Sequence, residues 1–415
     1  FLCEETSLKP ITTDILVCGG GISGLLTAKS LLNLGLSVVC LEKMKGSLKC
    51  EAIVEDGRST ALIQPSINFL SDLGLWRNLS QKSQALESLI LCNLSPDKNL
   101  IDESCEFSAN DLNLETLGFN IPNDFLTSEL KKSLISESKF IFLDDVVIQD
   151  LVSKSKEITA VTDQGHKITS KLVIGADGKS GSLRELTKIG KFSIDYNQKA
   201  LVFAIKHEQN HKAKSFEIYE SGGPCTLVPN KTSKADGYFS SVVLMQNLKE
   251  VQKTLSLDME ELAVFITKRT GNLLGKCEIT TKIKKFPIMS QISRQFVGDR
   301  SLLLAESAHV MPPIGAQGMN SSIQDIKFLT ELLDLEAKDN KDYGQSNLLD
   351  KFEKARANKI RSRMLGIHIL NKVSINGNGL ALTMRKLGLR GLSKNLKLRK
   401  FVMNLGMYEK FQAIQ

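Results

Sequence analysis

The sequence lacks the features that would indicate a membrane-spanning, secreted or metal-binding protein. No apolar run among its 415 residues reaches the roughly 18 to 20 residues that a membrane-spanning helix needs. The first ten residues carry no basic region followed by an apolar core, so we expect no secretory signal. No two of the eight cysteines are spaced as C-x-x-C, and we therefore expect reduced thiols, no metal site and a cytoplasmic location.

Acidic residues are scarce in the C-terminal part of the chain. From Lys351 onward, fifteen lysines and arginines stand against only Glu353 and Glu409, a balance of +13. Because the whole chain carries +8, the first 350 residues carry about −5. This asymmetry indicates that the basic C-terminal segment faces a polyanionic surface of a partner. It argues against nucleic acid as a partner of the whole protein.

Residues 13–42 have the pattern of a strand, a helix and a second strand. Residues 13–18 and 37–41 are apolar runs, and residues 22–34 have helical periodicity. Gly19 and Gly21 lie in the turn before the helix and Gly24 lies in its first turn, as in a G-x-G-x-x-G motif. Such a turn lets a pyrophosphate approach a helix N-terminus, and Glu42 at the end of the second strand can bind ribose hydroxyls. This unit predicts a bound dinucleotide but does not identify it.

Residues 302–320 predict a flavin. They begin as an apolar strand, place a carboxylate at its end, and continue through two prolines and two glycines into a helix. A backbone that lies flat against a large planar ligand requires this succession of strand, carboxylate, prolines and glycines. The carboxylate can accept a hydrogen bond from a ribityl hydroxyl, and the loop offers N–H groups to the pyrimidine edge of the ring. The candidate ligands are Glu306, Pro313, Gly315, Gly318, Met319 and Asn320.

Two further segments contribute candidates. Arg58, in the segment 56–62, is a planar cation suited to a phosphate or to the electron-rich edge of a flavin, although an exposed loop arginine is the alternative. Asp177 and Gly178 follow the apolar run 172–175. Asp177 can cap the next helix and orient groups near a pyrophosphate, and a capped turn without any ligand is the alternative there.

These motifs together resemble the class A flavoprotein aromatic hydroxylases, the para-hydroxybenzoate hydroxylase-like group, and most of all its ubiquinone-biosynthesis hydroxylases. The likeness covers residues 12–370 and includes Gly223-Pro224 and Asp325. It implies FAD as cofactor, NADH or NADPH as reductant, and O2 as co-substrate. It also implies oxygen transfer, through a flavin C4a-hydroperoxide, to the ring of a polyprenyl phenol, with no amino acid named as catalytic acid or base. A related monooxygenase acting on a soluble aromatic, and a non-catalytic FAD-binding subunit of a biosynthetic complex, remain as alternatives.

The sequence departs from the family pattern at three places. Ala305-Glu306 stands where the family commonly has Gly-Asp, so the carboxylate sits on a longer arm. Gly181 replaces a frequent serine, and Asp124 replaces a frequent arginine, which puts a phosphate contact there in doubt.

The expected fold is α/β, with a Rossmann-like FAD-binding domain of the glutathione reductase type, an inserted antiparallel-sheet substrate domain and a C-terminal helical region. We assign residues 11–75, 125–185 and 291–365 to the FAD-binding domain, 76–124 and 186–290 to the substrate domain, and 366–415 to the basic helical region. The substrate pocket is expected between the flavin ring and the strands around 200–245, with Pro312, Pro313 and Ile314 near the ring.

The segment 384–415 mixes apolar and basic residues, so it predicts either an amphipathic segment on anionic lipid or a terminal helix packed on the domain. In the first case the protein would be peripheral on the inner membrane, near other ubiquinone-biosynthesis proteins. His309 is expected to pack or hydrogen-bond, and His207 with His211 is not expected to hold a metal.

Overall fold

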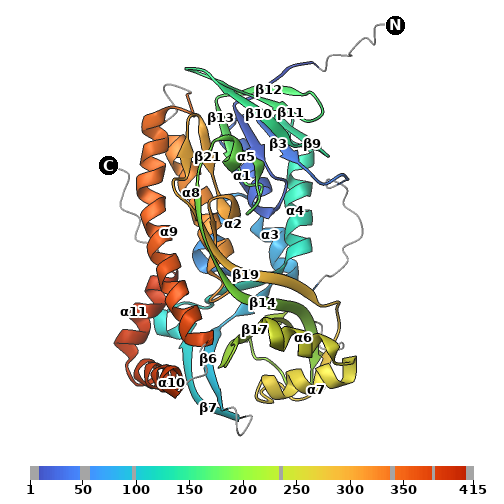
Figure 1. The fold of residues 1–415 in the computed structure, drawn as a ribbon, viewed down its shortest axis with the longest axis vertical. Helices are drawn as coiled ribbons and strands as arrows, with labels where there is room; N and C mark the ends of the chain where they lie inside the picture. The colour runs from blue at the N-terminus through green and yellow to red at the C-terminus, as the bar shows by residue number, and fades with distance from the viewer. Residues whose placement is uncertain are drawn as a thin grey trace.

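A computed structural model describes residues 9–46, 57–95, 100–232, 237–336, 342–375 and 379–407. Cys3, Cys50, Asp56 and residues 408–415, on which predictions were made above, lie outside this part. The described chain forms two stacked sheet regions, and one long helix, α9 (Ser346–Ile375), runs alongside both of them (Figure 1).

A six-stranded sheet carries the dinucleotide motif. Its order is β20 (Val297–Gly298), β21 (Ser301–Leu303), β13 (Leu172–Gly175), β2 (Ile15–Cys18), β3 (Val38–Glu42) and β9 (Phe140–Asp144). Neighbours from β21 to β9 pair in parallel, which requires long crossover connections. Helix α1 (Ile22–Asn33) makes the crossover from β2 to β3, so the predicted strand–helix–strand unit is confirmed.

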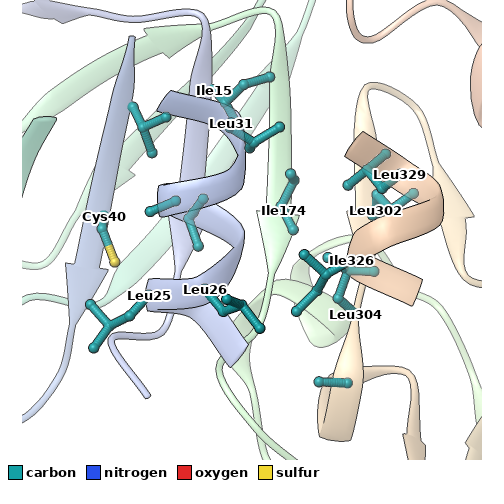
Figure 2. Close-up of a cluster of buried hydrophobic side chains, with 14 of the residues drawn as sticks. Ile15, Leu25, Leu26, Leu31, Cys40, Ile174, Leu302, Leu304, Ile326 and Leu329 are labelled. Atoms are coloured by element: carbon teal, nitrogen blue, oxygen red, sulfur yellow. The ribbon is translucent and has the colours of Figure 1, made fainter. Parts of the chain in front are cut away.

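The main core lies around this sheet because parallel strands are buried on both faces. Ile15 and its neighbours in β2 are fully buried, and Leu26 of α1 packs onto the sheet. Figure 2 shows Leu302 of β21 close to Ile326 and Leu329 of α8 (Gln317–Glu336). Helices α1 and α8 are in contact, so the two helices that begin at the predicted ligand motifs share one core.

Two small sheets flank this core. The four-stranded one has the order β1 (Ile11–Thr12), β12 (Lys167–Ser170), β11 (Ile158–Thr162) and β10 (Ile148–Ser153). The three-stranded one has the order β4 (Ser59–Ile63), β8 (Gly118–Pro122) and β5 (Gln84–Leu86). Helix α2 (Gln64–Asp72) contacts β8, and α5 (Ser182–Leu186) contacts β10. Helix α4 (Asn123–Ile135) contacts β8, α1 and the short helix α3 (Trp76–Leu79).

The second half of the fold is a larger, mostly antiparallel sheet. Its order is β22 (His309–Val310), β19 (Lys284–Ser293), β14 (Lys191–His207), β17 (Tyr238–Asn247), β16 (Gly223–Asn230), β15 (Lys214–Glu220), β6 (Ser88–Ser95) and β7 (Leu100–Ser108), with β18 (Cys277–Ile279) also on β14. The pair β15–β6 is parallel. Helices α6 (Leu248–Ser256) and α7 (Met259–Arg269) pack beside these strands.

The last described part of the chain is helical, as predicted. After α9 come α10 (Gly379–Lys394) and α11 (Leu396–Met407), which lie next to β6 and β7 (Figure 1). Leu389 and Met403 form a small buried cluster with Cys105 and Phe107 of β7. Within the described residues, every helix is too short or too polar to cross a membrane.

The α/β fold with an antiparallel second region and a helical C-terminal part is confirmed. The domain boundaries remain a proposal. The small sheet joins β4, from a segment assigned to the FAD-binding domain, to β5 and β8, from a segment assigned to the substrate domain. Strands β6 and β7 from that same segment extend the large sheet.

Candidate functional site

A cavity of about 540 Å³ lies at the carboxyl ends of β2, β3 and β13. This edge is where ligands bind in open α/β sheets, because the crossover helices leave their N-termini there. The structure brings nine of the predicted ligands to this cavity from five separate segments of the chain. They are Gly19, Gly21, Glu42, Arg58, Asp177, Gly178, Glu306, Gly318 and Met319.

The N-terminus of α1 forms one wall of the cavity. Gly21 is the N-cap of the helix, and its missing side chain leaves the first-turn N–H groups open to a ligand. A Cβ on Gly21 would meet no atom within 4 Å. Gly24 does not line the cavity. A Cβ there would lie 1.8 Å from the carbonyl oxygen of Gly19, so Gly24 allows the helix to approach the turn.

Glu42 closes one end of the cavity at the last residue of β3. Its carboxylate accepts hydrogen bonds from the backbone N–H of Gly20, at 2.7 Å, and of Met44, at 2.9 Å. These bonds fix the carboxylate beside the glycine turn. It is therefore held where a ribose hydroxyl of a dinucleotide would lie, as the glycine motif predicts.

Asp177 links the segment after β13 to the turn after β21. Its carboxylate accepts hydrogen bonds from Ser307 Oγ at 2.8 Å and from the Leu183 N–H at 3.2 Å. A Cβ on Gly181 would lie 1.9 Å from Asp177 Oδ1, so glycine at this position makes room for the carboxylate. Buried Arg184 donates to the carbonyl oxygen of Ser307 at 3.0 Å and strengthens the same link.

Glu306 lies in a short 3₁₀ turn, Ala305–Ser307, and not at the end of a continuous strand. Its side chain is exposed and lines the cavity. Ala305 just before it has φ of +53°, a conformation that favours glycine. The departure from Gly-Asp therefore places an alanine in a left-handed position.

Replacing Ala305 with glycine is expected to raise the free energy of unfolding by about 0.5 kcal/mol. The relief of left-handed strain, about 1 kcal/mol or more, exceeds the added flexibility of the unfolded chain. Urea denaturation of the two proteins measures the change. Buried Ala308, with φ of −90°, is the matched control, and Ala308→Gly should lower stability by about 1 kcal/mol. A lower stability for Ala305→Gly would contradict the assignment of strain.

Arg58 precedes β4 and is half-buried between two cavities. One is the cavity described above. The other has a volume of about 440 Å³ and is also lined by Ser241, Phe239 and Thr281. Arg58 thus lies against a ligand-sized space on either side and not on an open loop surface.

His309, Asp325 and Arg356 form a buried row behind the cavity. One carboxylate oxygen of Asp325 accepts a hydrogen bond from His309 Nε2 at 2.7 Å. The other accepts one from Arg356 Nε at 2.5 Å. Burial by itself would raise the pKa of Asp325, but the Arg356 charge and the His309 hydrogen bond hold that pKa below its usual value. The row joins β22, α8 and α9, and it matches the expectation that His309 is a hydrogen-bonding residue.

Asn320 is buried away from the cavity and holds β4 against α8. Its side-chain oxygen accepts from the Ile63 N–H at 3.0 Å and from Ser66 Oγ at 2.8 Å. Its amide nitrogen donates to the carbonyl oxygens of Ala61 at 2.9 Å and Ala316 at 2.7 Å. Its side chain is therefore engaged by the protein itself.

Pro313 and Gly315 line a different, mostly apolar cavity of about 280 Å³. It lies at the place expected for a substrate pocket, next to Ile314 and the strands β15 and β16. Strands β4, β6 and β7 and helix α11 form its other walls, which the sequence did not suggest. Residues 310–319 border both cavities, so one loop separates the candidate cofactor space from the apolar space.

Sequence reasoning missed several residues that line the larger cavity. They are Lys43, Asn123, Val146, Val147, Ile148 and Ser180. The segment 146–148 follows β9, the neighbour of β3, so its position at the carboxyl edge could have been inferred only from the strand order.

The large cavity fits a flavin adenine dinucleotide. It offers an open helix N-terminus, a carboxylate at the end of β3 and a cradle without Cβ atoms at Gly21 and Gly318. His309, which also lines it, has a buried Nδ1 with no hydrogen-bond partner among the described residues. A buried polar atom of this kind is usually satisfied by a ligand or water.

Comparison with known proteins agrees with this assignment. Residues 12–364 match the FAD binding domain family. The ubiquinone hydroxylase UbiM of Neisseria meningitidis is 25% identical over 404 residues, which is 97% of this chain and 86% of UbiM. The ubiquinone hydroxylase UbiL of Rhodospirillum rubrum is 26% identical over 343 residues, 83% of this chain and 77% of UbiL.

Among solved structures, the p-nitrophenol 4-monooxygenase PnpA of Pseudomonas putida DLL-E4 has the same fold. It matches with a TM-score of 0.76 at 15% identity and covers 96% of this chain and 100% of its own. The resemblance to the flavoprotein aromatic hydroxylases is thereby confirmed. The chain belongs to the FAD binding domain family and is an FAD-dependent monooxygenase.

Proposed function

We propose that this protein hydroxylates the aromatic ring of a polyprenyl phenol in ubiquinone biosynthesis, with NADH or NADPH as reductant and O2 as oxygen source. The observation that carries the proposal is the apolar cavity of about 280 Å³ across the loop from the FAD cavity. Leucines of β4, β6 and the segment before β8 line it, as suits a phenol with an isoprenoid substituent. Two relatives, UbiM and UbiL, are named ubiquinone hydroxylases.

The residues of this chain would position the reactants. Bound FAD would supply the redox chemistry, accepting a hydride from the nicotinamide and activating O2. The α1 N-terminus and Glu42 would hold its adenine half, while Asp177 and Glu306 would orient the middle of the molecule. Pro313 and the following loop residues would keep the ring against the apolar cavity, whose walls exclude water from the transfer.

Oxygen consumption by the FAD-loaded protein tests this function. With NADH or NADPH, ortho-farnesylphenol should stimulate oxygen uptake, and isotopically labelled O2 should place one labelled atom in the ring product, measured by mass spectrometry. Stronger stimulation by para-hydroxybenzoate, a soluble phenol, would favour a monooxygenase for small aromatics. FAD binding without stimulated uptake by either phenol would contradict an enzymatic role and favour a non-catalytic subunit.

We also propose that α10 and α11 bring the protein to an anionic membrane surface, where a polyprenyl phenol is found. Two ion pairs hold one face of these helices against the rest of the protein. Lys386 pairs with Asp102 at 2.6 Å, and Arg399 pairs with Asp111 at 2.7 Å. Val402 of α11 also lines the apolar cavity. A substrate tail that leaves this cavity along α11 would reach lipid directly.

The outer face of the two helices combines apolar and basic side chains. Phe401 is 65% exposed and Leu405 is 67% exposed, and Leu387 is exposed on α10. Lys394 and Lys397 are also exposed beside them. This combination is typical of helices that lie in the interface of anionic bilayers.

Replacing both Phe401 and Leu405 with glutamate is expected to weaken binding to phosphatidylglycerol vesicles at least about tenfold, because two apolar anchors are lost and negative charge is added. Co-sedimentation measures binding. Ile135→Glu is the matched control, since Ile135 is 66% exposed and belongs to α4, a helix that lies far from α11 (Figure 1). Equal binding by the double variant, or loss of binding by the control as well, would argue against a membrane role for α11.

A further inference from the structure

A row of polar side chains on β15 faces the apolar cavity. Ser215, Glu217 and Tyr219 alternate along the strand and therefore point to one side of the sheet. All three line the cavity and are only 6%, 2% and 9% exposed. Among the described residues that line this cavity, Glu217 is the single acidic or basic side chain.

Glu217 is held as a hydrogen-bond acceptor at the loop that borders both cavities. The Tyr219 hydroxyl donates to Glu217 Oε1. Burial raises the pKa of Glu217, and the hydrogen bonds from Tyr219 and from the Gly315 backbone lower it by less. Burial and the Glu217 charge raise the pKa of Tyr219, against the effect of Arg385 on α10, so the phenol of Tyr219 stays protonated.

Two polar atoms in the same cavity lack a protein partner. Ser215 Oγ is buried without a hydrogen bond from or to any described residue, and so is Oε1 of Gln317, the first residue of α8. Leaving buried polar atoms unpaired is unfavourable, so they indicate a polar group supplied by a ligand. The cavity thus combines apolar walls with one short polar row, which fits a phenol ring and its hydroxyl.

We propose that Glu217 accepts the proton of the substrate hydroxyl during ring hydroxylation, with Tyr219 as the positioning residue that orients its carboxylate. This inference rests on the proposed function, which supplies O2 and the reductant. The O–H bond of the phenol breaks as an O–H bond to Glu217 forms. The electron pair left on the phenol oxygen moves into the ring, which forms a new bond to one oxygen atom of O2. The O–O bond breaks, and the hydride of the reductant and a proton convert the other oxygen atom to water. Negative charge passes from Glu217 to the substrate, and the ring carbon then loses its hydrogen as a proton.

The chemistry of Glu217 suits this task. A base transfers protons best when its pKa approaches that of the acid, and a phenol has a pKa of about 10. An ordinary surface glutamate is too weak a base, whereas burial makes Glu217 stronger. The hydrogen bond from Tyr219 keeps one carboxylate oxygen engaged and so limits the orientations of the other.

Binding to the FAD-loaded protein tests the contact without turnover. The wild type should bind ortho-farnesylphenol about tenfold more tightly than its methyl ether, which has no proton to donate to a charged acceptor. In Glu217→Gln this preference should fall below about threefold. Glu106→Gln, an exposed carboxylate paired with Lys214 at 2.9 Å, should keep it. Flavin fluorescence reports both affinities, and FAD content confirms that each variant is folded.

Measuring the hydroxylation rate then shows whether Glu217 is a catalytic base or a residue that only binds the substrate. The wild-type hydroxylation rate should fall as the pH drops through the raised pKa of Glu217, because the protonated acid cannot accept a proton. Glu217→Gln should lose this acid limb, form mostly hydrogen peroxide, and recover rate with a more acidic, fluorinated phenol. Tyr219→Phe should keep the acid limb with a lower rate.

Equal wild-type affinity for the phenol and its ether would overturn the inference. So would a Glu217→Gln variant that keeps wild-type coupling and the acid limb. If the wild type turns over no phenol, the proposed function fails. The binding comparison alone then decides whether Glu217 accepts a hydrogen bond from the phenol hydroxyl.

Discussion

Replacing Gly21 with aspartate is expected to remove FAD from the protein while leaving its fold intact. Gly21 has φ of −74° and ψ of −180°, which is extended backbone that any residue adopts. An added Cβ meets no atom within 4 Å. The new carboxylate would cap the first turn of α1 and occupy the N–H groups that a pyrophosphate needs, and its charge would repel the phosphates. We expect FAD affinity to fall at least about 100-fold, or about 2.7 kcal/mol.

Gly21→Asn is the matched control because asparagine has the size and capping ability of aspartate without its charge. FAD retained after gel filtration and the Kd from flavin fluorescence measure the effect. Thermal unfolding of the two apoproteins should give closely similar Tm values, which shows that the fold is kept. Wild-type FAD content in Gly21→Asp would mean that the pyrophosphate does not bind at the N-terminus of α1.

Replacing Arg356 with leucine is expected to lower the free energy of unfolding by about 3–5 kcal/mol. Arg356 is fully buried and donates to Asp325, which is buried as well. Without the guanidinium, the Asp325 carboxylate keeps the hydrogen bond from His309 but loses the opposite charge beside it, and an uncompensated buried charge is unfavourable. The pKa of Asp325 should rise, because Arg356 is the main opposing influence to burial. Urea denaturation of the apoprotein measures the loss.

A second substitution identifies the cause of this loss. Asp325→Asn in the Arg356→Leu background removes the unpaired charge but keeps a side chain of the same size beside His309. Most of the lost stability should return, since removing both charges of a buried pair costs far less than removing one. If the double variant is no more stable than Arg356→Leu, the loss comes from packing of the long arginine side chain and not from its charge.

The local parts of the fold could be predicted because their causes lie in neighbouring residues. The turn 19–24 needs glycines at fixed spacing between an apolar strand and a helix, so its structure follows from a short segment. The same holds for Asp177, which lies two residues after the end of its strand, and for the C-terminal helical region. The cofactor was predictable for this reason, as was the expectation that His309 forms a hydrogen bond.

The roles of Asn320 and Gly315 could not be predicted from the residues next to them in the sequence. Both are near the predicted flavin loop in sequence, yet Asn320 holds β4 and Gly315 lines the apolar cavity beside Glu217. Glu217 itself had no motif around it. The other walls of its cavity come from β4, from the loop and from α11, which are distant in sequence and meet only in the tertiary structure.

The sequence by itself therefore determined the Rossmann-like unit, the bound dinucleotide and the family, since each depends on backbone conformations that a few adjacent residues specify. Only the tertiary structure decided which side chains share a cavity. The pairing of β15 with β6 and the packing of α11 place a buried carboxylate and leucines around one space, with polar atoms that have no partner in the described part of the chain. Burial and hydrogen bonding, which set the chemistry of Glu217, depend on those long-range contacts.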